Sequence, residues 1–172
     1  MLTTVAVLII LLGLMVDLAG YVRNRSANDL TRQVLAQLDQ AMAQYTKLLP
    51  IDPATDKPVA PNIDAFTVGT ELSEDEPTLL KNARQNNRDA IAALAAAGLL
   101  QADLFGKLPP GIYDGTSLND AWDTPIVFMP ASHSKIGMAP SGAGFFFSAG
   151  PDRLYKTRED NLYSYEVRAI TQ

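Results

Sequence analysis

The first 49 residues contain no proline, and they begin with an almost unbroken apolar run. Residues 2–16 have the sequence LTTVAVLIILLGLMV, after which the pattern becomes amphipathic and continues up to Pro50. Proline removes a backbone donor and interrupts helices, so a long proline-free stretch that stops at a proline favours one continuous helix. We therefore predict a helix over residues 1–49. A helix whose first half is apolar needs apolar surroundings, which constrains what the rest of the chain can be.

The apolar half of this helix predicts a membrane span over residues 1–22. If the run is continued across Asp17 to Val22, it covers about 33 Å at 1.5 Å per residue, which matches a hydrocarbon core. Arg23 and Arg25 then end it. A cleaved signal peptide is the alternative, but no basic segment precedes the run and the helical pattern continues past it. We expect a retained helix, with Asp17 at the level of the headgroups.

The second half of the helix carries apolar residues at steps of three and four. This spacing places them in one stripe along the helix, as is typical of a face that packs on a protein core. We expect the stripe to hold the remaining chain against the helix. Its members are Leu30, Val34, Leu38, Met42, Tyr45 and Leu49.

Residues 50–172 are enough for one small domain, which we call the head. Five prolines between residues 50 and 77 predict loops or short extended pieces. A capping box of Ser73 and Glu76 predicts a second helix near residues 75–97, with Gly98 as its stop. Short β-prone runs follow at 125–129, 135–138, 144–148 and 162–167. The predicted fold class is α+β, with the long N-terminal helix packed on a small antiparallel sheet.

Composition excludes several functions. The net charge is −5 without a basic run, so nucleic acid is not an expected partner. The absence of cysteine removes disulfides and thiol catalysis. His133 is the single histidine, and no second ligand-type residue stands beside it, so we expect an ordinary loop residue. No nucleophile elbow or phosphate loop is present, and we predict no enzymatic activity and no catalytic residues.

One stretch near the C-terminus has the chemistry of a calcium site. Asp152 and Asp160 bracket a loop that also offers Glu159, Asn161 and backbone carbonyls. Calcium takes six to eight hard oxygen ligands, and such a loop can supply them, although the spacing is not that of an EF-hand. The alternative is a hairpin loop with solvated charges and a pairing of Arg158. On these residues alone, both interpretations stay open.

Taken together, the chain resembles type IV pilin-like proteins, most closely the major pseudopilin of a type II secretion system. The long N-terminal helix, the segment DAWDTPIVFMP from Asp120 to Pro130, and the motifs FFFSAGPD and EDNLYSY carry the resemblance. The family has glycine after the tryptophan of the first segment, where this chain has Asp123. The ligand positions that match the family's calcium site are Asp152 and Asp160.

The resemblance implies a structural pseudopilin subunit, assembled through its N-terminal helix into a short periplasmic filament for protein secretion. The expected partners are copies of the chain, other pseudopilins, the inner membrane and, if a leader lies upstream, a prepilin peptidase. The implied location is the inner membrane, single-pass, with the head in the periplasm. Since the family's leader and early glutamate do not stand here, we expect an N-terminally truncated chain that assembles poorly. The alternative function is a membrane-anchored monomeric extracytoplasmic binding module.

Overall fold

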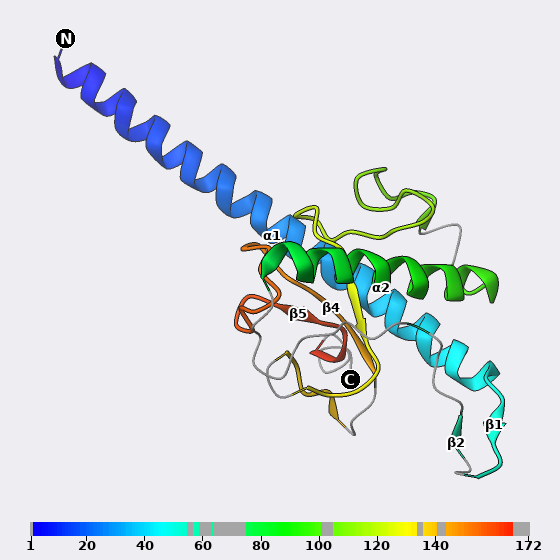
Figure 1. Ribbon diagram of the computed structural model, residues 1–172. Coiled ribbons are helices and arrows are strands. Elements are labelled where there is room, and N and C mark those ends of the chain that lie inside the picture. The colour runs from blue at the N-terminus through cyan, green and yellow to red at the C-terminus, as the bar shows by residue number, and fades with distance from the viewer. Residues whose placement is uncertain are drawn as a thin grey trace.

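The computed structural model describes the backbone of both helices and of five short strands (Figure 1). The helices are α1 (Leu2–Leu48) and α2 (Glu76–Ala96). The strands are β1 (Ile51–Asp52), β2 (Lys57–Pro58), β3 (Val127–Met129), β4 (Phe145–Ser148) and β5 (Leu162–Tyr163). The described residues are 2–54, 57–58, 63, 75–100, 105–133, 136–140 and 144–166. The mixture of helices with a small antiparallel sheet is the α+β fold predicted from the sequence.

Helix α1 is 47 residues long and ends two residues before Pro50. Figure 1 shows its N-terminal half projecting away from the other elements, whereas its C-terminal half runs beside α2 and the sheet. Among the α1 side chains that the structure describes, from Val22 onward, burial starts at Thr31 and includes Val34, Leu35 and Leu38. The boundary between the projecting and the packed half therefore lies near residue 30, where the predicted apolar stripe begins.

The prediction of a membrane span over residues 1–22 is wrong. In the described part of the chain, no helix combines the length and the hydropathy needed to cross a bilayer. The physical reason lies at Asp17, because the uninterrupted apolar run of residues 2–16 covers only about 23 Å, whereas a hydrocarbon core is about 30 Å thick. The predicted single-pass location in the inner membrane, with the head in the periplasm, is therefore wrong.

Helix α2 lies where the sequence predicts a second helix, but its N-terminal cap differs from the prediction. The cap is Asp75, whose side chain accepts a hydrogen bond from the Thr78 backbone amide at 3.3 Å. Hydrogen bonds from the Thr78 side chain and then from its backbone amide lower the pKa of Asp75 below its usual value. The predicted cap Ser73 lies outside the described residues. At the other end, Gly98 has φ +67°, and Gly98 and Leu99 donate to Ala95 and Leu94, which is a Schellman ending.

Strands β3, β4 and β5 form an antiparallel sheet in that order, and β1 pairs with β2 as a separate hairpin. The predicted strand at 135–138 is not formed; Gly137 makes only an isolated bridge with His133, and Lys135 lies outside the described residues. Strand β5 is shorter than predicted, because the chain turns helical at residues 164–166. The Ser164 hydroxyl accepts a hydrogen bond from the Phe146 backbone amide at 3.1 Å. In a longer strand, a backbone carbonyl would accept this bond.

The three phenylalanines of β4 divide between two core clusters. Phe146 belongs to a cluster with α1 and α2 side chains such as Leu38 and Leu94. Phe145 and Phe147 belong to a second cluster with loop residues, including Tyr155. Successive side chains on a strand point to opposite faces, so an unbroken apolar run indicates a strand covered on both sides. The β4 burial pattern agrees, since all four residues are buried.

Candidate functional site

The loop from Ala149 to Asn161 joins β4 to β5 and contains both predicted calcium ligands. Its two ends touch at Gly150, where a Cβ atom would meet the Asp160 carbonyl oxygen at 2.0 Å. Gly150 also has φ +72°, a backbone conformation that favours glycine. Only glycine fits this position, because the backbones of the two loop ends come into direct contact here.

Asp152 and Asp160 occupy different environments in this loop. Asp152 is half-buried, and its Oδ1 accepts a hydrogen bond from the Leu154 amide at 2.9 Å, which fixes the turn. Asp160 is exposed, and its amide donates to the Thr157 carbonyl at 3.1 Å. One carboxylate oxygen of Asp152 is thus engaged in the turn, and Asp160 reaches solvent.

Asn161 supplies the oxygen that lacks a partner. Its side chain is only 5% exposed, and its Nδ2 donates to the Tyr155 carbonyl at 3.2 Å. Its Oδ1 is buried and accepts no hydrogen bond within the part of the chain that the structure describes. An unsatisfied buried acceptor costs about 1–3 kcal/mol, so a donor or a cation at this oxygen is expected. This orphan oxygen, directly after Asp160, is the observation that fits a hard cation.

The charges of the loop fit a cation less well. Three acids and three bases stand between residues 152 and 160, so their charges cancel: Asp152, Glu159, Asp160, Arg153, Lys156 and Arg158. Among the described residues, no three histidine, cysteine or acidic side chains gather closely enough to hold a metal. A calcium ion here would take most of its oxygens from the backbone and from Asn161. The alternative of a loop with solvated charges agrees with the exposure of Arg153, Arg158 and Glu159.

A buried carboxylate that the sequence did not single out supports the start of the loop. Asp120 is 1% exposed; its Oδ1 accepts from the amides of Trp122 and Thr124, each at 2.9 Å. Its Oδ2 accepts the Ser148 hydroxyl at 2.6 Å, and that hydroxyl in turn accepts the Gly150 amide at 3.0 Å. Burial raises the pKa of Asp120 despite these bonds.

Tyr155 joins the middle of the loop to the segment before β3. Its hydroxyl donates to the Pro125 carbonyl at 2.7 Å, and the side chain is 2% exposed. Burial raises the pKa of this tyrosine above its usual range. The loop therefore rests on a buried frame, although the charged side chains of its outer part reach solvent.

His133 lies far from this loop in the sequence and shapes a turn of its own. Its amide donates to the Gly137 carbonyl at 2.9 Å, and its carbonyl accepts the amides of Ile136 and Gly137. The side chain is half-buried. The described residues place no metal-binding group around it.

No protein family model, curated protein or solved structure matches this chain. Its function is therefore inferred from its own residues and geometry.

Proposed function

We propose that the chain is a structural, non-enzymatic subunit of a pilin-like filament, of the pseudopilin type. The observation that carries the proposal is the projection of the N-terminal half of α1 away from the head (Figure 1). The sequence of this half is apolar from Leu2 to Val16. Apolar surface of this extent is stable only when other apolar groups cover it.

The proposed cover is the same segment of other copies. Every copy presents an apolar helical half, and its own head packs on the other half of α1, where Leu35, Leu38 and Met42 are buried. Helices packed side by side along their apolar faces bury this surface. When the contact joins different patches on identical subunits and does not close, the product is a fibre.

The head supports the same proposal through its position on α1. Side chains from α1, α2 and the sheet share one core cluster. The Ala121 amide donates to the Thr31 hydroxyl at 3.2 Å, which ties the segment before β3 to the middle of α1. In the proposed filament, the N-terminal halves form the centre, and the heads surround them. A role in protein secretion, with other pseudopilins as partners, is part of the proposal and rests on the resemblance of the sequence.

Self-association measured by sedimentation velocity over a range of concentrations tests the proposal. Ile9→Asp with Leu12→Asp places two charges in the projecting half and is expected to leave monomers at all concentrations. Gln40→Asp with Gln44→Asp adds the same charge to exposed positions on the packed half of the same helix and serves as the control. We expect the control to associate like the unchanged chain.

Two results would count against the proposal. Association of the Ile9 and Leu12 variant at the same concentrations as the unchanged chain would remove the N-terminal half as the contact. An unchanged chain that sediments as a monomer throughout would instead support a monomeric binding module.

A further inference from the structure

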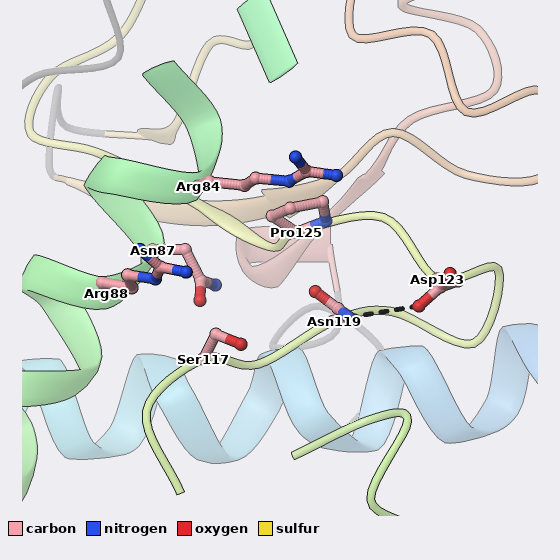
Figure 2. Close-up of a pocket in the computed structure, with 7 residues that line it drawn as sticks. All are labelled: Arg84, Asn87, Arg88, Ser117, Asn119, Asp123 and Pro125. Carbon is pink, nitrogen blue, oxygen red and sulfur yellow. Dashed lines mark hydrogen bonds between the residues drawn. The ribbon is translucent and has the colours of Figure 1, made fainter. Parts of the chain in front are cut away.

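A polar pocket of about 130 Å³ lies between α2 and the segment that leads into β3 (Figure 2). For comparison, a cavity of about 150 Å³ holds a molecule the size of benzene. The pocket is thus large enough for a small molecule or for one terminal group of a larger one. Its lining residues are Arg84, Asn87, Arg88, Ser117, Asn119, Asp123 and Pro125.

Two arginines from α2 provide the positive wall of the pocket. Arg84 and Arg88 are four residues apart, so they lie on one face of the helix, and both are exposed. In Figure 2 the Arg84 side chain extends from α2 over Pro125, and the Arg88 side chain lies next to Asn87. Neither guanidinium forms a salt bridge with a described residue. The ion pair among the described residues joins Arg32 and Glu166 at 3.9 Å, and neither of these residues lines the pocket. Two neighbouring like charges destabilise a helix slightly, and a bound anion relieves this repulsion.

Asp123 provides a negative group at the opposite side of the pocket. Its Oδ1 accepts a hydrogen bond from the Asn119 Nδ2 at 3.3 Å, which is drawn in Figure 2. Its backbone has φ +68°, in the left-handed region, which aspartate adopts more readily than most other residues with a side chain. The carboxylate is therefore held at the pocket by a turn of fixed geometry.

The three charges select the ligand. Two guanidinium groups and one carboxylate give the lining charges of both signs, so it suits a ligand that presents a carboxylate beside a hydrogen-bond donor. The planar fork of arginine binds a carboxylate through two parallel hydrogen bonds. A phosphate dianion would carry a second negative charge toward Asp123, whereas an N–H group next to the carboxylate would donate to it.

We propose that this pocket binds a carboxylate with a neighbouring N–H or ammonium group, the chemistry of an amino acid or of the last residue of a peptide. Arg84 and Arg88 hold the carboxylate, and Asp123 accepts the nitrogen group. The buried amide of Asn87 is engaged with the Leu118 and Ile126 carbonyls, so it shapes the floor of the pocket. The proposal is independent of filament assembly, since none of these residues lies on α1.

Calorimetric titration of the full chain at constant ionic strength tests the proposal with four probes. Glycine carries both groups, acetate only the carboxylate, glycinamide only the amine, and triglycine presents the same end on a peptide. We expect glycine to bind more tightly than acetate, and acetate more tightly than glycinamide. Triglycine binding more tightly than glycine would identify a peptide end as the source, and the reverse order would identify a free amino acid.

Substitutions then assign the residues. Arg84→Gln with Arg88→Gln should weaken glycine binding by more than tenfold, because hydrogen bonds to charged groups contribute about 1.5–3 kcal/mol. Asp123→Asn should remove the preference for glycine over acetate while acetate still binds. Lys81→Gln, on the same helix but outside the pocket lining, is the control and should bind like the unchanged chain.

Three results would overturn the assignment. They are unchanged glycine binding in the double arginine variant, equal binding of glycine and glycinamide, and the absence of saturable heat with every probe. A circular dichroism melt of each variant checks that its fold is retained, and a variant with a lower midpoint is titrated at a temperature where it is folded.

Discussion

At the scale of single residues, two neighbouring asparagines on α2 take the place of a missing β-strand. The Asn86 Oδ1 accepts a hydrogen bond from the Phe128 backbone amide at 2.7 Å, and the Asn86 Nδ2 donates to the Phe128 carbonyl at 2.9 Å. A paired strand would form the same two bonds. Asn87 accepts the Leu118 amide at 2.9 Å and donates to the Ile126 carbonyl at 2.6 Å. Strand β3 is at the edge of its sheet, and an open edge invites pairing with another chain. Asn86 closes this edge at Phe128, and Asn87 binds the backbone of Ile126, the residue before β3.

Asn86→Ala should lower the free energy of unfolding by about 2–4 kcal/mol, because it leaves a buried amide and a buried carbonyl of Phe128 unsatisfied. Urea denaturation measures the change. Gln85→Ala, at the adjacent exposed position, should alter stability by less than about 0.5 kcal/mol. Similar losses in the two variants would show that the amide bonds to β3 contribute little.

Asp120 predicts a dependence of stability on pH. Burial raises its native pKa above the value of 3.8 for the unfolded chain. Between these two pKa values the native state keeps a proton that the unfolded state has released. The stability that Asp120 contributes is therefore fully present below the unfolded pKa of 3.8, and it is lost as the pH rises through the native pKa. The stability that Asp114 contributes depends on pH in the opposite direction, because hydrogen bonds from Thr116 and Ser117 lower the pKa of Asp114.

Comparison with Asp120→Asn isolates this contribution, because the variant keeps Asp114 and all other titrating groups. Urea unfolding of both proteins between about pH 3 and pH 7 gives the difference in stability at each pH. We expect the unchanged chain to lose stability relative to the variant as pH rises. A constant difference across this range would contradict the assignment to Asp120.

At the scale of elements, the loop between β4 and β5 depends on a backbone contact at one glycine. Gly150→Ala should destabilise the chain by more than about 3 kcal/mol, since it combines left-handed backbone strain with a Cβ placed 2.0 Å from the Asp160 carbonyl oxygen. Gly115 separates the two effects, because it has φ +93° but nothing within 4 Å of its Cβ. Gly115→Ala should cost about 1 kcal/mol. Equal costs in urea unfolding would mean that the loop closes without the contact.

At the scale of the whole molecule, calcium binding to the β4–β5 loop is expected to appear as global stability. A ligand that binds only the folded chain raises its stability, by about 2.7 kcal/mol at a concentration of 100 times the dissociation constant. We expect the thermal midpoint to be higher in calcium than in chelator. Asp152→Asn with Asp160→Asn should abolish this difference, whereas Asp114→Asn, in an exposed turn, should keep it. Equal midpoints of the unchanged chain under both conditions would remove Asp152 and Asp160 as ligands.

The elements that the sequence predicted best are those with local signals. Pro50 and Gly98 stop the two helices within two residues of the predicted ends, because a missing amide and a left-handed backbone act on the adjacent turn. The spacing of Val34 and Leu38 identified the buried face of α1 for the same reason. Residues 2–16 misled the membrane prediction, since their apolar character is clear but the needed length depended on passing Asp17.

The sequence by itself therefore determined the α+β class, the two helices and the strand-rich C-terminal part. Only the tertiary structure decided that Asn86 and Asn87 bind the backbone at and just before β3. The same holds for Asp120, which anchors the β4–β5 loop, and for the buried Asn161 Oδ1, which accepts no hydrogen bond from the described residues. The bonds of Asn86 and Asn87 span 42 and 31 residues, and that of Asp120 to Ser148 spans 28. Periodicity and capping act over a few residues, and they carry no information on which distant backbone a polar side chain meets.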